Sequence, residues 1–177
     1  MGLAKVTSIQ DVGEGTRVCL DFVDVLEADE GVLVGNTGHG YVFLHAEFQG
    51  SETYPPRPFR VNVGAIHHYV LLAEDKTGYL SDLKPGMKVP VWKKDGTCRL
   101  VAIGRVKVEK RPLVRVCLDC QGIEISATVQ KSDSVRFAGP EHAVQMVDLQ
   151  PADEVLVHAD EPGRHIGERI EEYIREM

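Results

Sequence analysis

An internal repeat is the feature that most limits how this chain can fold. The pattern Asp82-Leu83-Lys84-Pro85-x-x-x-Val89-x-Val91 returns 66 residues later (148 − 82) as Asp148-Leu149-Gln150-Pro151-x-x-x-Val155-x-Val157. In each copy the proline belongs to a turn and the valines alternate along a strand, a pattern typical of small β structures. A repeat at this period predicts two related units that pack on each other.

The rest of the sequence favours the same class of fold. Short β-favouring runs, separated by glycine and proline, occupy most of the chain, and Asp95-Gly96 is a strong hairpin turn. We therefore predict a mainly β protein. Its body is expected to consist of two related small β-barrel-like lobes from an internal duplication, residues 31–96 and 97–163.

The two ends of the chain carry their own predictions. Strand-like runs at 4–9 and 16–23, separated by Gly13-Glu14-Gly15, predict a β-hairpin region over residues 1–30. At the other end, apolar residues recur at helical spacing on one face. Residues 164–177 are therefore predicted to form a C-terminal α-helix.

Composition excludes some classes of function. The 177 residues carry a net charge of −7, which argues against a sequence-independent hold on nucleic acid, because such binding needs clustered cations. No apolar run approaches the ~20 residues that a membrane span requires. No long apolar stretch follows the first residues, so no signal peptide is expected and a cytoplasmic location is predicted.

The residues best suited to chemistry gather in two neighbouring stretches, 44–47 and 57–69. His45 and Glu47 are one residue apart, so on a strand they share a face and could both bind a divalent metal. His67 could add a third nitrogen from a neighbouring strand, and such a site would polarise a carbonyl group. The alternative is that His45 and Glu47 simply hydrogen-bond each other at a polar rim.

Two arginines in the second stretch, and an arginine and a histidine near the end of the chain, complete the candidate set. Arg57 and Arg60 present forked donors that match a carboxylate or phosphate, although surface ion pairing would explain them equally well. His67 is preferred over His68 because it keeps the alternation of the preceding strand. Arg164 and His165 lie at the start of the predicted helix, where an anion is favoured; a simple helix cap is the alternative.

Seven motifs, in order, resemble the archaeal-type 3-dehydroquinate synthase family (dehydroquinate synthase II). The resemblance extends from about residue 5 to residue 175. The motifs are Glu30-Gly31-Val32-Leu33-Val34-Gly35-Asn36, His45-Ala46-Glu47, Arg57-Pro58-Phe59-Arg60-Val61-Asn62-x-Gly64, His67-x-Tyr69, Tyr79-Leu80-Ser81-x-Leu83-Lys84, Gly104-Arg105-Val106-Lys107 and Arg164-His165-x-Gly167.

The resemblance implies a reaction. Members of the family close the ring of an aminated seven-carbon keto sugar acid, an aldol-type cyclisation that in archaea is coupled to NAD-dependent deamination and yields 3-dehydroquinate. A related branch makes 3-amino-4-hydroxybenzoate and needs manganese. The resemblance thus implies NAD and a divalent metal, Mn²⁺ or Zn²⁺, as cofactors, and an acidic small molecule as substrate.

The matching positions also receive roles. We expect three residues to act in catalysis: His67, His165 and Glu47. Substrate binding is assigned to Arg57, Arg60, Asn62 and Arg164, and the metal to His45, Glu47 and His67.

The resemblance covers only the C-terminal half of the family's sequences. A separate chain is therefore expected to supply the N-terminal half, with a stand-alone enzyme, a homo-oligomer or a non-catalytic ligand- or partner-binding module as the alternatives.

Overall fold

The computed structural model describes residues 1–161, 164–165, 168–169 and 174–177. In that part of the chain twelve strands form one sheet. They are β1 (Gly2–Phe22), β2 (Glu30–Gly35), β3 (Gly40–His45), β4 (Arg60–Ala65), β5 (Tyr69–Leu71), β6 (Thr77–Tyr79), β7 (Lys88–Lys93), β8 (Cys98–Cys120), β9 (Ile123–Gln130), β10 (Arg136–Ala138), β11 (Ala143–Gln145) and β12 (Glu154–Ala159). Three short 3-10 helices join them: η1 (Ala73–Asp75), η2 (Leu80–Asp82) and η3 (Met146–Asp148). The prediction of a mainly β protein is confirmed.

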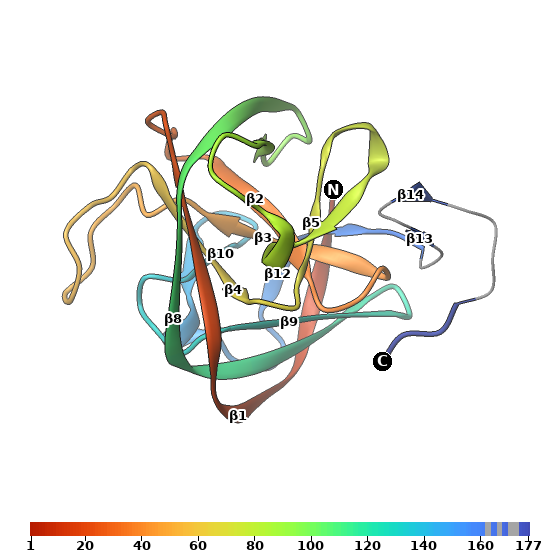
Figure 1. Ribbon diagram of the computed structural model, residues 1–177. Coiled ribbons are helices and arrows are strands. Elements are labelled where there is room, and N and C mark those ends of the chain that lie inside the picture. The colour runs from red at the N-terminus through yellow and green to blue at the C-terminus, as the bar shows by residue number, and fades with distance from the viewer. Residues whose placement is uncertain (162–163, 166–167, 170–173) are drawn as a thin grey trace.

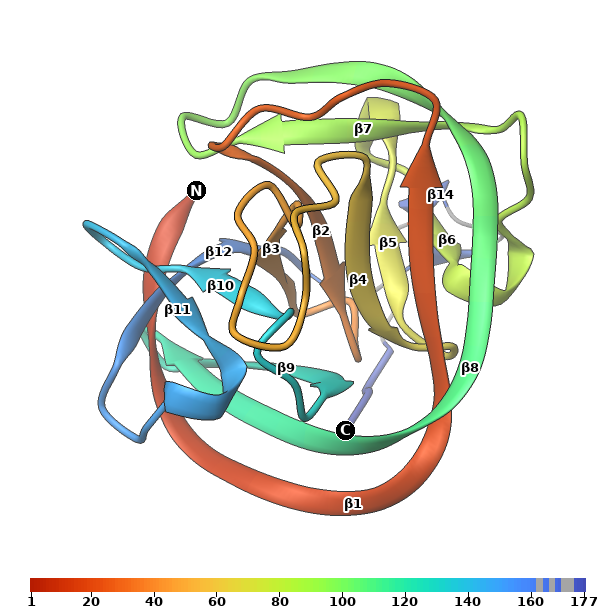
Figure 2. The ribbon, with the colours of Figure 1, turned by 90° about the vertical axis from the view of Figure 1, so that its left-hand side faces the viewer.

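Strands β1 and β8 are the longest elements, with 21 and 23 residues. They pair antiparallel over most of their length and curve together around β2, β3, β4 and β5 (Figures 1 and 2). Their register shifts at three places, and such bulges bend a strand while keeping it paired.

The predicted hairpin over residues 1–30 is wrong, because β1 continues without reversing direction. Gly13 has a φ of +82° beside one of the register shifts, so this glycine serves a bulge and not a turn. Strand β8 offers a partner from Lys5 to Phe22, which makes one long strand possible.

The internal repeat is visible in the strand pairing. The series β5, β6, η2, β7 recurs as β10, β11, η3, β12. Strand β7 pairs with β8 and β2, whereas β12 pairs with β1 and β3. In the same way β4 lies on β1 and β9 on β8. The two copies therefore make equivalent pairings, and both belong to the same sheet.

The predicted C-terminal helix is wrong for the residues that the structure describes. Arg164–His165 (β13) pairs with Glu168–Arg169 (β14), and residues 174–177 have no regular structure. The remaining part of the prediction, residues 166–167 and 170–173, lies outside the described residues. Apolar spacing alone did not specify a helix here, because the described segments 164–165 and 168–169 pair as strands. In the part of the chain that is described, every helix is too short or too polar to span a bilayer.

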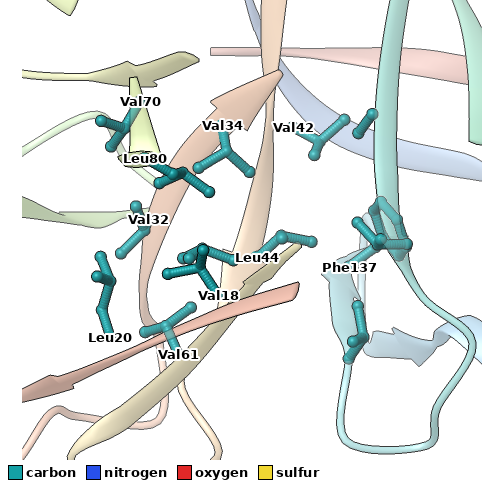
Figure 3. Close-up of a cluster of buried hydrophobic side chains, with 14 of the residues drawn as sticks. Val18, Leu20, Val32, Val34, Val42, Leu44, Val61, Val70, Leu80 and Phe137 are labelled. Atoms are coloured by element: carbon teal, nitrogen blue, oxygen red, sulfur yellow. The ribbon is translucent and has the colours of Figure 1, made fainter. Parts of the chain in front are cut away.

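The core lies between the curved β1–β8 pair and the β2–β3 hairpin. Side chains from β1, β2, β3 and β4 point toward one another there, among them Val18, Val34, Leu44 and Val61 (Figure 3). Every residue of β2 and β3 is buried, because a second apolar cluster around Phe43 covers their other face. Both strands are consequently rigid supports for the residues at their ends.

Gly64 allows β4 and β9 to approach closely. Substitution of Gly64 tests this packing. It has a φ of +83°, and a Cβ there would lie 2.5 Å from the Thr128 carbonyl oxygen. We expect Gly64→Ala to lower the free energy of unfolding by about 2 kcal/mol or more, measured by urea denaturation. Gly86→Ala is the matched control, since Gly86 has a φ of +92° with no atom within 4 Å of its Cβ position. Equal losses in the two variants would show that backbone strain alone, without a collision, explains the effect.

Candidate functional site

Polar and charged side chains from β1, β4 and β9, and from the loop before β4, gather into one group. We call this group the arginine–carboxylate centre. Its members are Arg17, Asp21, Glu47, Arg57, Arg60, Asn62 and Gln130. Strand register accounts for the meeting, because β1 and β4 pair so that Asp21 lies opposite Arg60 and Cys19 opposite Asn62. Five members are at most 6% exposed, and buried charged groups of this kind are rare unless they are paired or functional.

Asp21 anchors one end of the centre. Arg60 donates from Nε and Nη2 to its two carboxylate oxygens, at 2.7 and 3.0 Å, and Arg105 Nε donates at 2.8 Å. Burial raises the pKa of Asp21, but the bonds from Arg60 and Arg105 outweigh burial and leave that pKa below its usual value. Arg60 is thus already held by a carboxylate. Asp21 and Arg105 also line a cavity of about 480 Å³ together with Phe59.

Glu47 lies at the other end of the centre. An isolated bridge ties its backbone to Arg57, and its carboxylate is 3.7 Å from Arg57 Nη1. Burial raises the pKa of Glu47, although the charges of Arg60, Arg57 and Arg17 oppose the rise. A carboxyl group with a raised pKa can hold and release a proton nearer to neutral pH, which is what general acid–base catalysis requires.

Several buried polar atoms between these two ends lack a partner. Arg17 Nη1 donates to Gln130 Oε1 at 2.6 Å, and Asn62 Nδ2 donates to the same oxygen at 2.9 Å. Arg17 Nε, Arg57 Nη1 and Asn62 Oδ1 are buried without a hydrogen bond. The 3.7 Å contact between Arg57 and Glu47 is an ion pair too long to be a hydrogen bond. Two guanidinium donors and an amide acceptor are therefore free to bind a ligand.

The sequence predicted four members of this centre and missed three. Glu47, Arg57, Arg60 and Asn62 were expected to act together, and the structure brings them together. Arg17, Asp21 and Gln130 belong to distant strands, and each is a charged or amide residue within an otherwise buried strand segment. That interruption of the apolar pattern was the available signal.

The three predicted metal ligands do not converge. His45 ends β3 opposite Gly31, whereas His67 bonds to Asn36 beyond the other end of β2. At about 3.3 Å per residue, the two histidines lie roughly 16 Å apart along the sheet. Strand β3 ends at His45, so Glu47 follows a different course and the shared face is lost. Among all described residues, no group of three or more His, Cys, Asp or Glu side chains could hold a metal ion.

The two neighbouring histidines differ in burial and lie in the turn after β4. His67 is exposed, and its Nε2 lies 2.8 Å from Asn36 Oδ1. His68 is fully buried: its Nδ1 donates to the Val63 carbonyl, and its Nε2 accepts from Thr128 N–H, both at 2.8 Å. His68 thus links β4 to β9. The backbone of Arg164 and His165 forms β13, and their side chains lie outside the described residues.

Comparison with known proteins identifies the family. Residues 3–177 match the model of the 3-dehydroquinate synthase II C-terminal domain. The chain belongs to the 3-dehydroquinate synthase II family.

Relatives of this family extend beyond the chain. The 3-dehydroquinate synthase homolog of Persephonella marina is 40% identical over 174 residues, which cover 98% of this chain and 53% of the relative. The 3-dehydroquinate synthase of Methanospirillum hungatei is 41% identical over 172 residues, 97% of this chain and 52% of the relative. The 3-dehydroquinate synthase of Methanococcus maripaludis is 43% identical over 174 residues, which cover 98% of this chain and 48% of the relative. The chain thus spans about half the length of the curated relatives it matches. No solved structure matches it.

Proposed function

We propose that this chain is the C-terminal half of a dehydroquinate synthase II-type cyclase and that its arginine–carboxylate centre binds the acidic substrate. One observation carries the proposal. Four positions that support the family resemblance, Glu47, Arg57, Arg60 and Asn62, meet at a single buried centre that keeps unpartnered donors. A scaffold without a ligand has no use for such donors, because each one costs free energy when buried.

The chemistry of an aldol-type ring closure suits these residues. The substrate, an aminated seven-carbon keto sugar acid, carries a carboxylate that Arg17 and Arg57 can bind through their free donors. Ring closure removes a proton from carbon and delivers one to the carbonyl oxygen, and Glu47 has the raised pKa that such transfers need. Asp21 keeps Arg60 in place beside them.

The family resemblance also implies NAD and a divalent metal, but the described part of this chain has no recognisable binding site for either of them. The sequence has no Gly-x-Gly-x-x-Gly motif after a strand, and His45, Glu47 and His67 do not converge. The proposal therefore assigns only the ring closure to the residues of this chain. The deamination needs NAD as the electron acceptor, and no described residue of this chain is given that step. A separate chain that supplies the missing half, consistent with the length of the relatives, would complete the site.

Binding of 3-dehydroquinate tests the ligand site directly. Calorimetric titration of the purified chain should show binding that weakens about tenfold in Arg57→Lys, since lysine cannot donate in a fork. Arg115→Lys, on β8 outside the centre, is the matched control and should bind like the wild type. Equal affinities in the two variants would remove Arg57 from the proposed site.

Activity tests the role of Glu47. The chain mixed with the N-terminal half of the Methanospirillum hungatei relative, the aminated substrate and NAD, which takes up the two electrons of the deamination, should form 3-dehydroquinate and ammonia. Glu47→Gln should abolish product formation while the titrated affinity for 3-dehydroquinate stays within about threefold. Binding without product in every mixture would instead favour a non-catalytic ligand-binding module.

A further inference from the structure

A second cavity lies at the end of β3, away from the arginine–carboxylate centre. It has a volume of about 700 Å³, within the range of small-molecule sites. Its walls come from the end of β3, the turn between β7 and β8, the β10–β11 hairpin and η3. The hairpin lies beside β3 in Figure 2, where Phe137 pairs with Leu44. No residue that lines this cavity belongs to the arginine–carboxylate centre.

His45 lines the cavity with its hydrogen-bonding capacity unused. The residue is only 7% exposed, and among the described residues neither ring nitrogen has a well-directed hydrogen bond, although the Ala28 backbone lies near enough to raise the pKa of the ring. Burial lowers the pKa of His45 to about 4, and the charges of Lys94 and Arg136 act in the same direction. The Ala28 backbone and Asp29 oppose the shift without reversing it. At neutral pH the ring therefore has one donor and one acceptor, and a buried polar side chain normally finds partners for both.

Two cations stand beside this histidine. Arg136 donates to the backbone carbonyls of Gln49 and Gly50, at 2.7 and 2.9 Å, which fixes the start of the loop between β3 and β4. That loop extends from the body at the left of Figure 1. Among the described residues Lys94 makes one long contact, 3.5 Å to the Gly139 carbonyl, so its ammonium group keeps donors for a ligand.

Acidic side chains limit the charge that the cavity can accept. Asp29, Glu141 and Asp148 line it too, and all three are exposed. Each of the three carboxylates repels a dianion about twice as strongly as a monoanion, so the cavity favours a ligand with one negative charge. Phe48 and Val144 add apolar surface for the uncharged part of a ligand.

We propose that this cavity is a second ligand site, which binds a small monocarboxylate through Lys94 and the ring N–H of His45. The free nitrogen of His45 accepts a hydrogen bond from a hydroxyl group on the same ligand. The inference does not depend on the arginine–carboxylate centre or on the proposed cyclase activity, because the two sites share no residue.

Lactate, a monocarboxylate with a neighbouring hydroxyl group, is the probe. The purified chain, labelled with ¹⁵N in its histidines, is titrated with lactate at neutral pH while the ring signals of His45 are followed by NMR. We expect these signals to move and to saturate. Lactamide has the same shape without the charge and should leave the signals in place, and inorganic phosphate should bind more weakly than lactate.

Two neighbouring lysines supply matched variants. Lys94→Gln removes the ammonium group inside the cavity and should weaken lactate binding about tenfold. Lys93→Gln makes the same change in charge on a side chain that does not line the cavity. Lys93 pairs with Glu27 at 2.7 Å and more distantly, at 3.9 Å, with Asp29, and this variant should bind lactate like the wild type. Neither variant should alter the affinity for 3-dehydroquinate at the other site.

Three outcomes would overturn the proposal. The first is that the His45 signals do not respond at high lactate concentration. The second is that Lys93→Gln and Lys94→Gln weaken binding equally, as expected if only the overall charge mattered. The third is that phosphate binds more tightly than lactate, which would make the cavity a site for dianions.

Discussion

Asp21→Asn should lower the free energy of unfolding by about 3 to 5 kcal/mol, the usual cost of removing one partner from a buried ion pair. Asp21 is 2% exposed and accepts three hydrogen bonds from Arg60 and Arg105. Asparagine keeps the shape of the side chain but leaves Arg60, which is mostly buried, without its hydrogen-bonded counter-charge. Urea denaturation of the wild type and the variant at neutral pH measures the loss.

The pH dependence gives this prediction a second readout. The pKa of Asp21 is lower in the folded chain than in the unfolded chain, so its contribution is present above the unfolded value and is lost as the pH falls through the folded one. The difference between wild type and Asp21→Asn should therefore shrink in acid. Asp24→Asn serves as the control, because Asp24 is exposed and pairs with Arg99 at the surface. If both variants lost the same stability, the buried network around Asp21 would not be a major support of the fold.

Different parts of the fold were predictable to different degrees. The repeat around Leu83 and Leu149 predicted equivalent strands, since a proline turn followed by alternating valines specifies a local structure. The course of β1 was not predictable from local sequence, because Gly13 fits a turn and a bulge equally well. Only the presence of β8 as a partner along the whole strand decides between them.

The candidate site shows the same division. Arg57, Arg60 and Asn62 are close in sequence, so their meeting needed little more than one strand and its preceding turn. Arg17 and Gln130 are 113 positions apart and come together only through the register of β1, β4 and β9. Metal ligands were predicted from alternation along one strand, and that argument failed because β3 ends at His45. Residue spacing is informative only within an element whose ends are known.

The hydrogen bonds that position the site also stabilise the fold. Gln130 holds Arg17 and Asn62 from the end of β9, and His68 joins β9 to β4 through the Thr128 N–H. The position of the arginine–carboxylate centre thus depends on a buried histidine that is not itself one of its members. A change in the protonation of His68 would be expected to disturb both strands.

Acid should destabilise the protein partly through His68, and His68→Gln should remove that part. Burial lowers the pKa of His68 to about 3, with the charge of His67 acting in the same direction and the bond to the Val63 carbonyl opposing it. In the unfolded chain this histidine binds a proton near pH 6.5, whereas in the folded chain it stays neutral down to a lower pH. Its contribution to the free energy of unfolding is therefore complete above pH 6.5 and is lost as the pH drops toward 3. This one group lowers the free energy of unfolding by about 3 kcal/mol between pH 6.5 and pH 4.

Glutamine carries a donor and an acceptor group, as the neutral ring of His68 does, yet it does not titrate. Denaturation curves between pH 4 and pH 7 should therefore show a shallower loss of stability in His68→Gln than in the wild type, even if the variant is somewhat less stable at pH 7. His67→Gln, at the exposed neighbouring position, should retain most of the wild-type slope. An unchanged slope in His68→Gln would mean that this histidine can be protonated without breaking its bonds between β4 and β9.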